Sequence, residues 1–440
     1  MFSIEKNQKY AIIVMQSHVL CVVKIHERNF CFMERNSIIP NKDKYMMTFN
    51  DVKNYISCPS GEHLGDFICS DDCFVRVIKV DGREVFDEFI ENLTHNGDFK
   101  LYFTNKMDGN IFYTFKAPFG MLHTYYTDYS STVRLVFDSL ESSILAPKED
   151  NEYVKVCDPS LTVMSLDYKR MLPGAAYGMS YVFTLSDGSY VIYDGGLSGD
   201  ADHLIEFLES NNKRQDGKVI VAAWIITHSH DDHYECLKTV LEQFSDKINI
   251  EKFVFNEARE EYFKDGKGFD GFLTTNIYKL ANGKYNNLKY VRLHTGQRMT
   301  VRDCVIEAFL THEDLYPSVI VGMNSTSLVT KVYLGGQTFM FLADEEGESD
   351  NILPKMYSDS LKSDFVQVTH HGYGGGTDEL YDLISPQYAM WPTARYFFNL
   401  VKDGKWEKAH SIYLLETVKV KEAFIAEGGH KTLILPYNKS

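Results

Sequence analysis

Ligand-type side chains are concentrated in the stretch Ala222–Glu235, which reads Ala-Ala-Trp-Ile-Ile-Thr-His-Ser-His-Asp-Asp-His-Tyr-Glu. Within six positions it holds three imidazoles and a carboxylate, namely His228, His230, Asp232 and His233. Imidazole suits zinc, iron and manganese, and carboxylate adds affinity for hard cations and balances their charge. A polar turn with surface histidines is the plain alternative, but four such residues in six positions favour a metal site.

The residues around this cluster predict a strand, a tight turn and a helix. Residues 219–226 form a short, β-branched apolar run, which is typical of a buried strand. From His233 to Phe244 the apolar residues recur at helical spacing. Side chains one and two positions apart can converge in an irregular turn, and the end of a buried strand is rigid enough to hold them accurately. Asp231 is a candidate for orienting one of the imidazoles.

Two later strand ends carry further candidate ligands. A predicted strand over residues 305–310 ends at His312. Predicted strands over 327–334 and 338–342 flank the tight turn Gly335-Gly336-Gln337, and this hairpin ends at Asp344. A carboxylate has two oxygens, so Asp344 is suited to bridge two cations.

A third predicted strand, residues 365–369, delivers the pair His370 and His371. Neighbouring residues on a strand point to opposite faces of a sheet, so the strand's phase alone does not say which histidine faces a metal. We take His370 as the ligand and His371 as a residue on the substrate side.

These donors would satisfy a site for two divalent cations, with zinc expected and manganese or iron as alternatives. The first cation would take His228, His230 and His312, the second would take Asp232, His233 and His370, and Asp344 would bridge them. In paired sites the ions lie about 3.5–4 Å apart and polarise one hydroxide between them. The predicted reaction is therefore hydrolysis, with Asp232 and His371 as the catalytic residues.

The stretch His228–His233 matches the H-x-H-x-D-H pattern of the metallo-β-lactamase superfamily, which the chain resembles over roughly residues 152–438. Asp194-Gly195-Gly196 follows a hairpin built on Asp187-Gly188, and Asp344 and His370 then appear in the family's order. The resemblance implies an α/β fold, an αββα sandwich of two mixed sheets with helices outside and the site along one edge. It also implies His228, His230, Asp232, His233, Asp344 and His370 as metal ligands.

Within that superfamily, the motifs most resemble the metallo-hydrolase domain of bacterial DNA-uptake competence channels. The similarity lies in residues 324–329, Asn-Ser-Thr-Ser-Leu-Val, and in His370-His371-Gly372. The chain departs from that pattern in lacking membrane segments and in carrying Tyr373-Gly374-Gly375-Gly376 after the His-His-Gly. Residues 313–317 also depart from the loop that is common in the superfamily's thioesterases and lactamases.

The amino-acid composition limits the classes of partner that the protein can be expected to bind. The formal net charge of the 440 residues is −16, so the overall field repels phosphate backbones and disfavours nucleic acid relative to a small-molecule substrate. No stretch reaches the length of a membrane span, and residues 1–10 lack the apolar core of a signal peptide. We expect a cytoplasmic protein.

Cys69 and Cys73 have no second cysteine pair or histidine pair nearby in the sequence, so all eight cysteines are interpreted as reduced and packed as small apolar residues.

The first 148 residues are predicted to be a separate β-rich domain, joined to residues 152–440 by the polar linker 145–151. One helix is predicted over residues 85–93, and the predicted strands cover 10–14, 19–25, 30–34, 74–80, 112–115 and 132–137. The domain's role is left open between capping the site, binding a partner and forming a homo-oligomer.

The function predicted is a soluble, metal-dependent hydrolase acting on a small phosphoester, since two cations can stabilise both the attacking and the leaving oxygen. Two alternatives stay open. One is a nuclease acting on single-stranded DNA or RNA, and the other is a metal-bound redox or sensor protein that does not hydrolyse.

Overall fold

The chain divides into two compact units, Met1–Met46 and Met47–Ser440. The computed structural model describes residues 10–15, 19–24, 56–70, 72–117, 120–139, 153–166, 178–264, 273, 276–347, 349, 351–406 and 410–438. In the first unit, β1 (Tyr10–Met15) pairs antiparallel with β2 (Val19–Lys24), as predicted. The predicted strand over 30–34 and the linker 145–151 lie outside the described residues, and the predicted boundary between domains stays a prediction.

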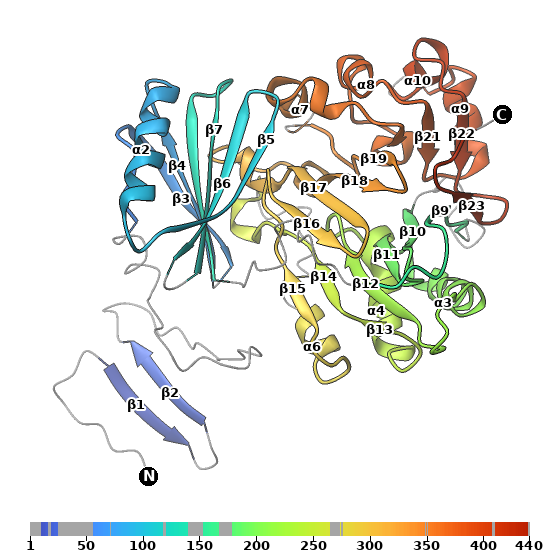
Figure 1. Cartoon of the computed structure of the whole chain (residues 1–440), viewed down its shortest axis with the longest axis horizontal. Coiled ribbons are helices and arrows are strands. Elements are labelled where there is room, and N and C mark those ends of the chain that lie inside the picture. The colour runs from blue at the N-terminus through green and yellow to red at the C-terminus, as the bar shows by residue number, and fades with distance from the viewer. Residues whose placement is uncertain are drawn as a thin grey trace. The chain divides into compact units, whose positions relative to one another are not determined.

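An antiparallel sheet over residues 62–138 begins the described part of the second unit. Its strands are, in spatial order, β3 (Glu62–Ser70), β4 (Cys73–Lys79), β8 (Thr132–Asp138), β7 (Gly120–Thr127), β6 (Asn110–Ala117) and β5 (Lys100–Met107). Helix α2 (Arg83–His95) covers one face of this sheet (Figure 1). The helix buries Phe86, Phe89, Ile90 and Leu93 there, so the predicted helix over 85–93 is confirmed.

The following residues form the first of two larger sheets. Its strand order is β15 (Lys289–Val291), β14 (Lys252–Val254), β12 (Ile220–Ile225), β11 (Tyr190–Asp194), β10 (Ser180–Thr184), β9 (Ser160–Val163) and β23 (Lys431–Ile434), with β13 (Asn249–Ile250) also paired to β12. Helices α3 (Ala201–Ser210), α4 (Asp231–Gln243) and α6 (Ile277–Ala281) pack on the outer face. The outer face is built from apolar strand residues that alternate with those of the inner face.

The second large sheet has the order β16 (Arg298–Val301), β17 (Cys304–Leu310), β18 (Val329–Leu334), β19 (Gln337–Phe341), β20 (Phe365–Gln367), β21 (Tyr388–Trp391) and β22 (Glu422–Ile425). The helices that pack on its outer side are α7 (Ile352–Met356), α8 (Asp378–Ile384), α9 (Arg395–Lys402) and α10 (Ile412–Glu416). The two predicted hairpins, β10–β11 and β18–β19, are both present.

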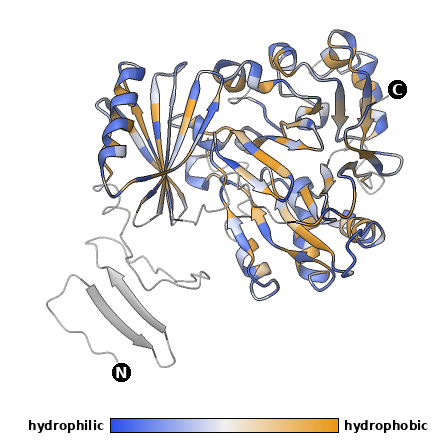
Figure 2. Ribbon diagram, in the orientation of Figure 1, coloured by the Kyte–Doolittle hydropathy of each residue, from blue (hydrophilic) through white to orange (hydrophobic). Residues whose placement is uncertain are grey.

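The two large sheets pack face to face over one apolar core (Figures 1 and 2). Aromatic side chains from both sheets meet there: the rings of Tyr193 and Phe341 stack with centroids 4.1 Å apart, and Phe183 meets Phe339 edge-on at 5.2 Å. Such pairs contribute about 0.5–1.5 kcal/mol beyond their buried area. With helices on both outer faces, this is the α/β, αββα sandwich that the sequence predicted, preceded by a smaller β-rich region.

Among the residues that the structure describes, no helix is both long and apolar enough to cross a membrane.

Candidate metal centre

Two groups of three ligand-type side chains converge where strands of both large sheets end. Within each group the ligand atoms lie within 4.8 Å of one another. The first group comprises His228, His230 and Asp344, and the second comprises Asp232, His233 and His371. Separations of this size let a single cation contact all three atoms of a group after small side-chain adjustments.

Each donor is positioned by the end of a regular element. Strand β12 ends at Ile225, and the next residues form the turn that carries His228 and His230. Asp232 and His233 lie in the first turn of α4. Asp344 follows β19, and His371 belongs to the short 3-10 helix η8 (Thr369–Gly372) after β20. The predicted strand, turn and helix around the His-rich stretch are thus confirmed.

The Asp344 carboxylate lies between the two groups. Its Oδ2 is 3.4 Å from Nε2 of His233, 3.1 Å from Nε2 of His371 and 4.0 Å from Nε2 of His228. Oδ2 of Asp232 is 3.0 Å from the same nitrogen of His371. A carboxylate in this place can contribute to either group or to both, which is the position predicted for a bridging ligand.

Two buried atoms at this place have no hydrogen-bond partner in the described part of the chain, Oδ1 of Asp344 and Nε2 of His233. Leaving a buried polar atom without a hydrogen bond costs about 1–3 kcal/mol, so native proteins rarely do it without a reason. A coordinated cation would satisfy both atoms. The donor chemistry, imidazole with carboxylate, therefore fits divalent zinc, iron or manganese.

The charges at the site depend on one another. Burial by itself would raise the pKa of Asp344, but the nearby His371 and His233 lower that pKa well below its usual range. Burial would lower the pKa of His371, but Asp344 and Asp232 raise it to about 10. His371 therefore carries a proton near neutral pH unless a cation replaces it, and binding of the cation would release that proton.

The pKa of His228 is shifted in the opposite direction from that of His371. Burial, helped by the neighbouring His233, lowers the pKa of His228 well below its usual range. Its Nε2 lies 3.0 Å from Nδ1 of His230, whose pKa burial also lowers. Neutral imidazole is the form that binds metals, so the first group is already in a ligating form at neutral pH.

Asp194 is a buried residue of the site that the sequence analysis did not assign. Its Oδ2 accepts a hydrogen bond from Nδ1 of His233 at 2.7 Å and one from Oγ1 of Thr227 at 2.8 Å, while its Oδ1 accepts from the Thr227 backbone N–H. The contact fixes the ring of His233 with Nε2 toward Asp344. A carboxylate at the end of a hairpin strand, before Gly195-Gly196, is the signal that would have identified it. Asp231, considered for this role, is exposed and accepts from the backbone of Asp232 instead.

The backbone has an uncommon conformation at several residues that carry or position the donor side chains. Asp194, Ala343, His370 and His371 all have positive φ, between 41° and 54°. Such left-handed backbone costs a non-glycine residue roughly 1–2 kcal/mol and clusters at functional sites. The side chain of Gln367 supports one of these bends by accepting from the N–H of Ala343 and donating to its carbonyl.

In the structure His371, and not His370, lies among the buried donors. His371 is buried in the second group, and its Nδ1 lies 2.9 Å from the carbonyl of Pro392. His370 is 27 % exposed, belongs to neither group, and has its Nε2 4.0 Å from Asp344. Nδ1 of His370 instead contacts Glu346 at 2.8 Å, and Asn324 donates to the other oxygen of that carboxylate.

His312 belongs to neither donor group. Its Nδ1 lies 3.1 Å from the hydroxyl of Tyr316 and its Nε2 lies 3.0 Å from Oδ1 of Asn256, so both ring nitrogens are engaged elsewhere. The residue is buried in the 3-10 helix η5 (His312–Leu315), and burial lowers its pKa to about 4. The first group holds Asp344 where His312 was expected.

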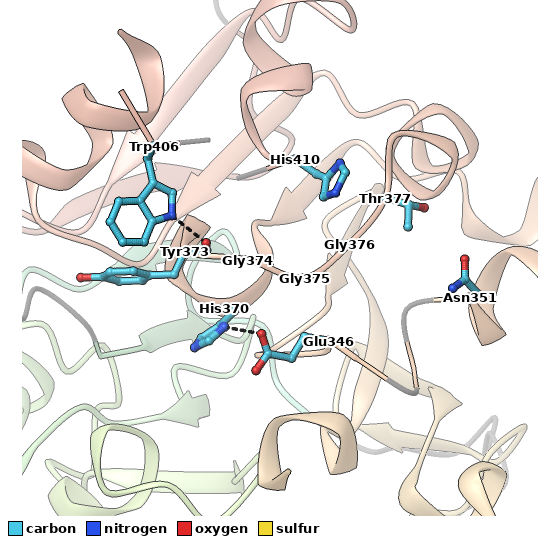
Figure 3. Close-up of a pocket in the computed structure, with 10 residues that line it drawn as sticks. All are labelled: Glu346, Asn351, His370, Tyr373, Gly374, Gly375, Gly376, Thr377, Trp406 and His410. Carbon is cyan, nitrogen blue, oxygen red and sulfur yellow. Dashed lines mark hydrogen bonds and ion pairs between the residues drawn. The ribbon is translucent and has the colours of Figure 1, made fainter. Parts of the chain in front are cut away.

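Two adjoining cavities open over the donors. One of about 320 Å³ is lined by His230, Asp231, Asp232, Asp344, His370, His371 and Tyr373. The other, of about 470 Å³, is lined by Glu346, Asn351, His370, Tyr373, Gly374, Gly375, Gly376, Thr377, Trp406 and His410 (Figure 3). His370 and Tyr373 line both cavities, and among the described residues neither lining contains a lysine or an arginine.

Comparison with solved structures gives distant similarities. YhfI of Bacillus subtilis, a metallo-beta-lactamase fold protein, is 14 % identical, with 62 % of this chain and 98 % of YhfI covered and a TM-score of 0.37. CmlA, a diiron beta-hydroxylase from Streptomyces venezuelae, is 13 % identical, with 80 % and 83 % covered and a TM-score of 0.39. Yeast PDE1 is 12 % identical, with 63 % and 99 % covered and a TM-score of 0.35.

Among curated proteins, none matches the chain significantly. The resemblance to competence-channel domains gains no support from these comparisons. The family model described as metallo-beta-lactamase superfamily matches residues 173–373, a span that contains all six residues of the two donor groups. The chain therefore contains a metallo-β-lactamase superfamily domain, and the candidate metal centre lies within it.

Proposed function

We propose that the chain is a metal-dependent hydrolase that acts on a small phosphodiester. The observation that carries this proposal is the meeting of two three-residue donor groups at the buried Asp344 carboxylate, on the floor of an accessible cavity. The superfamily consists mostly of metal-dependent hydrolases and typically binds divalent cations. Cations held by these donors would supply the Lewis acidity that makes water nucleophilic near neutral pH.

The ligands in this proposal are the six residues of the two groups. His371 is taken as a ligand, in exchange with His370, because its Nε2 lies 3.0–3.1 Å from Asp232 and Asp344 in a fully buried setting. Asp194 holds the ring of His233 in its ligating orientation. This arrangement gives one cation two imidazoles and the other two imidazoles and a carboxylate, with Asp344 shared.

His370 is proposed as the residue that handles the proton of the leaving group. Its ring lines both cavities, and Glu346 contacts its Nδ1 (Figure 3). Burial would lower the pKa of His370, but the hydrogen bond with Glu346 and the charge of Asp344 raise it. A protonated Nε2 at the cavity wall would donate to the departing oxygen, and Glu346 would hold the imidazolium in place.

The cavities favour a small substrate of low negative charge. A volume of about 320 Å³ is at the lower end of the range for small-molecule sites. A dianionic phosphomonoester or a long polynucleotide would find no lysine or arginine among the described residues of either lining, and the net charge of −16 gives such ligands no attraction. A monoanionic diester needs only the bound cations as its counter-charge.

Three chromogenic esters would test this function on protein loaded with Zn²⁺, Mn²⁺ or Fe²⁺. We expect bis(p-nitrophenyl) phosphate to turn over faster than p-nitrophenyl phosphate and p-nitrophenyl acetate, and Asp344→Asn to abolish turnover. Preference for the acetate ester would contradict the substrate class, and full activity in Asp344→Asn would contradict the site. Strong inhibition by single-stranded DNA that weakens steeply with salt would instead favour a nuclease.

A further inference from the structure

A second cluster of metal-ligating side chains lies outside the candidate metal centre, where the 62–138 sheet packs on the sandwich. Its five members come from β3, β4, β8, the segment after β15 and η5, and each is no more than 2 % exposed. They are Cys69, Cys73, Asp138, His294 and Glu313. Cys69 and Glu313 are 244 positions apart in the chain, so the spacing of residues in the sequence does not indicate this cluster.

The members form two overlapping groups that share Cys73. The ligand atoms of Cys69, Cys73 and Glu313 lie within 4.8 Å of one another, and so do those of Cys73, Asp138 and His294. Donors around a tetrahedral zinc ion are roughly 3.5 Å apart, given Zn–S near 2.3 Å and Zn–N near 2.0 Å. Small rotations of these side chains would therefore bring two sulfurs, one nitrogen and one oxygen around a single ion.

The histidine in this cluster is held as metal-bound histidines are. Nδ1 of His294 lies 2.6 Å from Glu313, and Nε2 lies 3.0 Å from Oδ2 of Asp138. The same oxygen of Asp138 is 3.0 Å from Nη1 of Arg292, which fixes the carboxylate. A ligating histidine usually donates its other N–H to a carboxylate, and Asp138 is placed to accept from Nε2 when Nδ1 faces an ion.

We propose that Cys69, Cys73, His294 and Glu313 form a structural zinc site that joins the 62–138 sheet to the sandwich. The donor set, two thiolates with an imidazole and a carboxylate, is soft enough to select zinc or ferrous iron over magnesium and calcium. Because every donor is buried, no position is open for a substrate, so the site is structural and separate from the hydrolase centre.

Binding at this site requires deprotonation of the ligands. Both thiols lose their protons, and a doubly protonated His294 loses the one on Nδ1, so up to three protons leave for each zinc ion that binds. Without an ion, the same residues form a different arrangement, in which His294 lies between the carboxylates of Glu313 and Asp138 and neither sulfur is bonded to a metal. The chains with and without an ion therefore differ in whether sulfur is bonded to metal, and absorption spectroscopy detects that difference directly.

Cobalt(II) is the probe, because thiolate ligands give it an intense near-ultraviolet charge-transfer band that nitrogen and oxygen ligands do not. Neither group of the candidate metal centre contains a cysteine, so cobalt bound there gives no thiolate band. We expect the full-length chain, reduced and stripped of metal, to gain this band on titration with cobalt, with a final intensity that corresponds to one thiolate-bound cobalt per chain. Asp344→Asn should keep the band even if hydrolysis is lost, so this site and the proposed function fail independently.

Cys73→Ser should abolish the band, and His294→Gln should weaken cobalt binding at least tenfold. Cys304→Ser removes a thiol that is equally buried but lies in β17, and it should leave the band unchanged. If Cys73→Ser does not fold, X-ray absorption of the zinc-loaded wild-type chain replaces it and should show sulfur neighbours. A folded wild-type chain without a thiolate band, or a band that survives in Cys73→Ser, would overturn the proposal.

Discussion

At the scale of single residues, the imidazoles of the metal centre are oriented by what each Nδ1 contacts. In His233 that partner is Asp194, and in His371 it is the carbonyl of Pro392. Both partners accept a hydrogen bond, so both rings carry hydrogen on Nδ1 and present Nε2 toward Asp344. The folded protein therefore fixes which ring nitrogen faces a cation before one binds, which lowers the cost of binding, and the proton on Nε2 of His371 leaves when the cation binds.

Replacing Asp194 by asparagine tests this orientation. The asparagine amide can still accept from the backbone of Thr227, but its NH₂ group cannot accept from Nδ1 of His233. We expect zinc affinity to fall about 10- to 100-fold, measured by competition with a chromophoric chelator. Asp231→Asn is the matched control, since the exposed Asp231 belongs to neither donor group and accepts from the backbone of Asp232, and its affinity should stay within about twofold of the wild-type value. Equal affinities in the two variants would contradict the role of Asp194.

Substitution of the adjacent histidines should have unequal effects. His371→Ala removes a donor of the second group and should bind one ion fewer per chain than the wild type, measured by plasma mass spectrometry after dialysis. His370→Ala leaves both groups intact and should bind as many ions as the wild type while lowering kcat for the diester by about 100-fold, as expected for loss of a general acid. Loss of metal from His370→Ala with full loading of His371→Ala would restore the assignment first made from the sequence.

The two places where the structure departs from the expected donor positions have a common physical cause. The sequence predicted that a strand over residues 365–369 leads directly into His370 and His371, but β20 ends at Gln367, and both histidines have left-handed backbone in which the alternation of a strand does not hold. His312 follows a strand as predicted, yet Asn256 and Tyr316 turn its ring away from the donors. The positions of strand ends can be predicted from hydrophobic pattern, whereas the direction of a side chain in an irregular turn depends on partners far away in the chain.

At the scale of elements, local pattern was most informative where one face of the element is polar. The helix predicted from His233 to Phe244 coincides with α4, whose apolar residues recur on one face. The strand β7 (Gly120–Thr127) was not predicted, because residues 121–127 are all buried and its sequence shows no alternation. A strand covered on both faces has no periodic signal and is recognised only where its residues are continuously apolar, as in β12, whereas His123, Thr124 and Thr127 interrupt the apolar residues of β7.

Gly296 offers a test of how tightly the 62–138 sheet packs on the sandwich. The residue has φ +82°, and a Cβ added there would overlap the buried ring of Phe112 in β6. Gly283 has φ +70°, and a Cβ added there would have no atom within 4 Å, so Gly283→Ala carries only the backbone strain. We expect Gly283→Ala to cost about 1 kcal/mol and Gly296→Ala about 3 kcal/mol or more in urea unfolding. Similar losses in both would mean that the sheet can move away from Gly296.

At the scale of the whole molecule, the 62–138 sheet and the sandwich share one core. A single buried apolar cluster contains Val75, Phe112 and Tyr125 of the sheet together with Phe309 and Leu342 of the sandwich. Buried polar contacts cross the same boundary, including the hydrogen bond from the hydroxyl of Tyr125 to Asp314 at 2.7 Å. Removing the sheet would expose this surface to water, so we expect residues 62–438 to unfold as one cooperative unit.

Arg134 provides the sharpest test of that cooperativity. Its guanidinium is buried in β8 and donates to the backbone carbonyls of Glu313, Asp314 and Tyr316 in the sandwich. A lysine has a single compact ammonium that cannot reach three carbonyls at once, so Arg134→Lys should lose about 2–4 kcal/mol. Arg83→Lys, at a partly exposed arginine that donates to the carbonyl of Gly109 within the sheet, should change stability by less than about 0.5 kcal/mol.

Urea unfolding followed by circular dichroism and by tryptophan fluorescence distinguishes a shared core from separate domains. All three tryptophans, Trp224, Trp391 and Trp406, lie in the sandwich, so fluorescence reports on it, while circular dichroism also reports on the sheet. If the core is shared, Arg134→Lys lowers both midpoints equally, because the contacts it loses stabilise both parts. If the sheet unfolds independently, the two probes already give different midpoints in the wild type, and Arg134→Lys shifts them by different amounts.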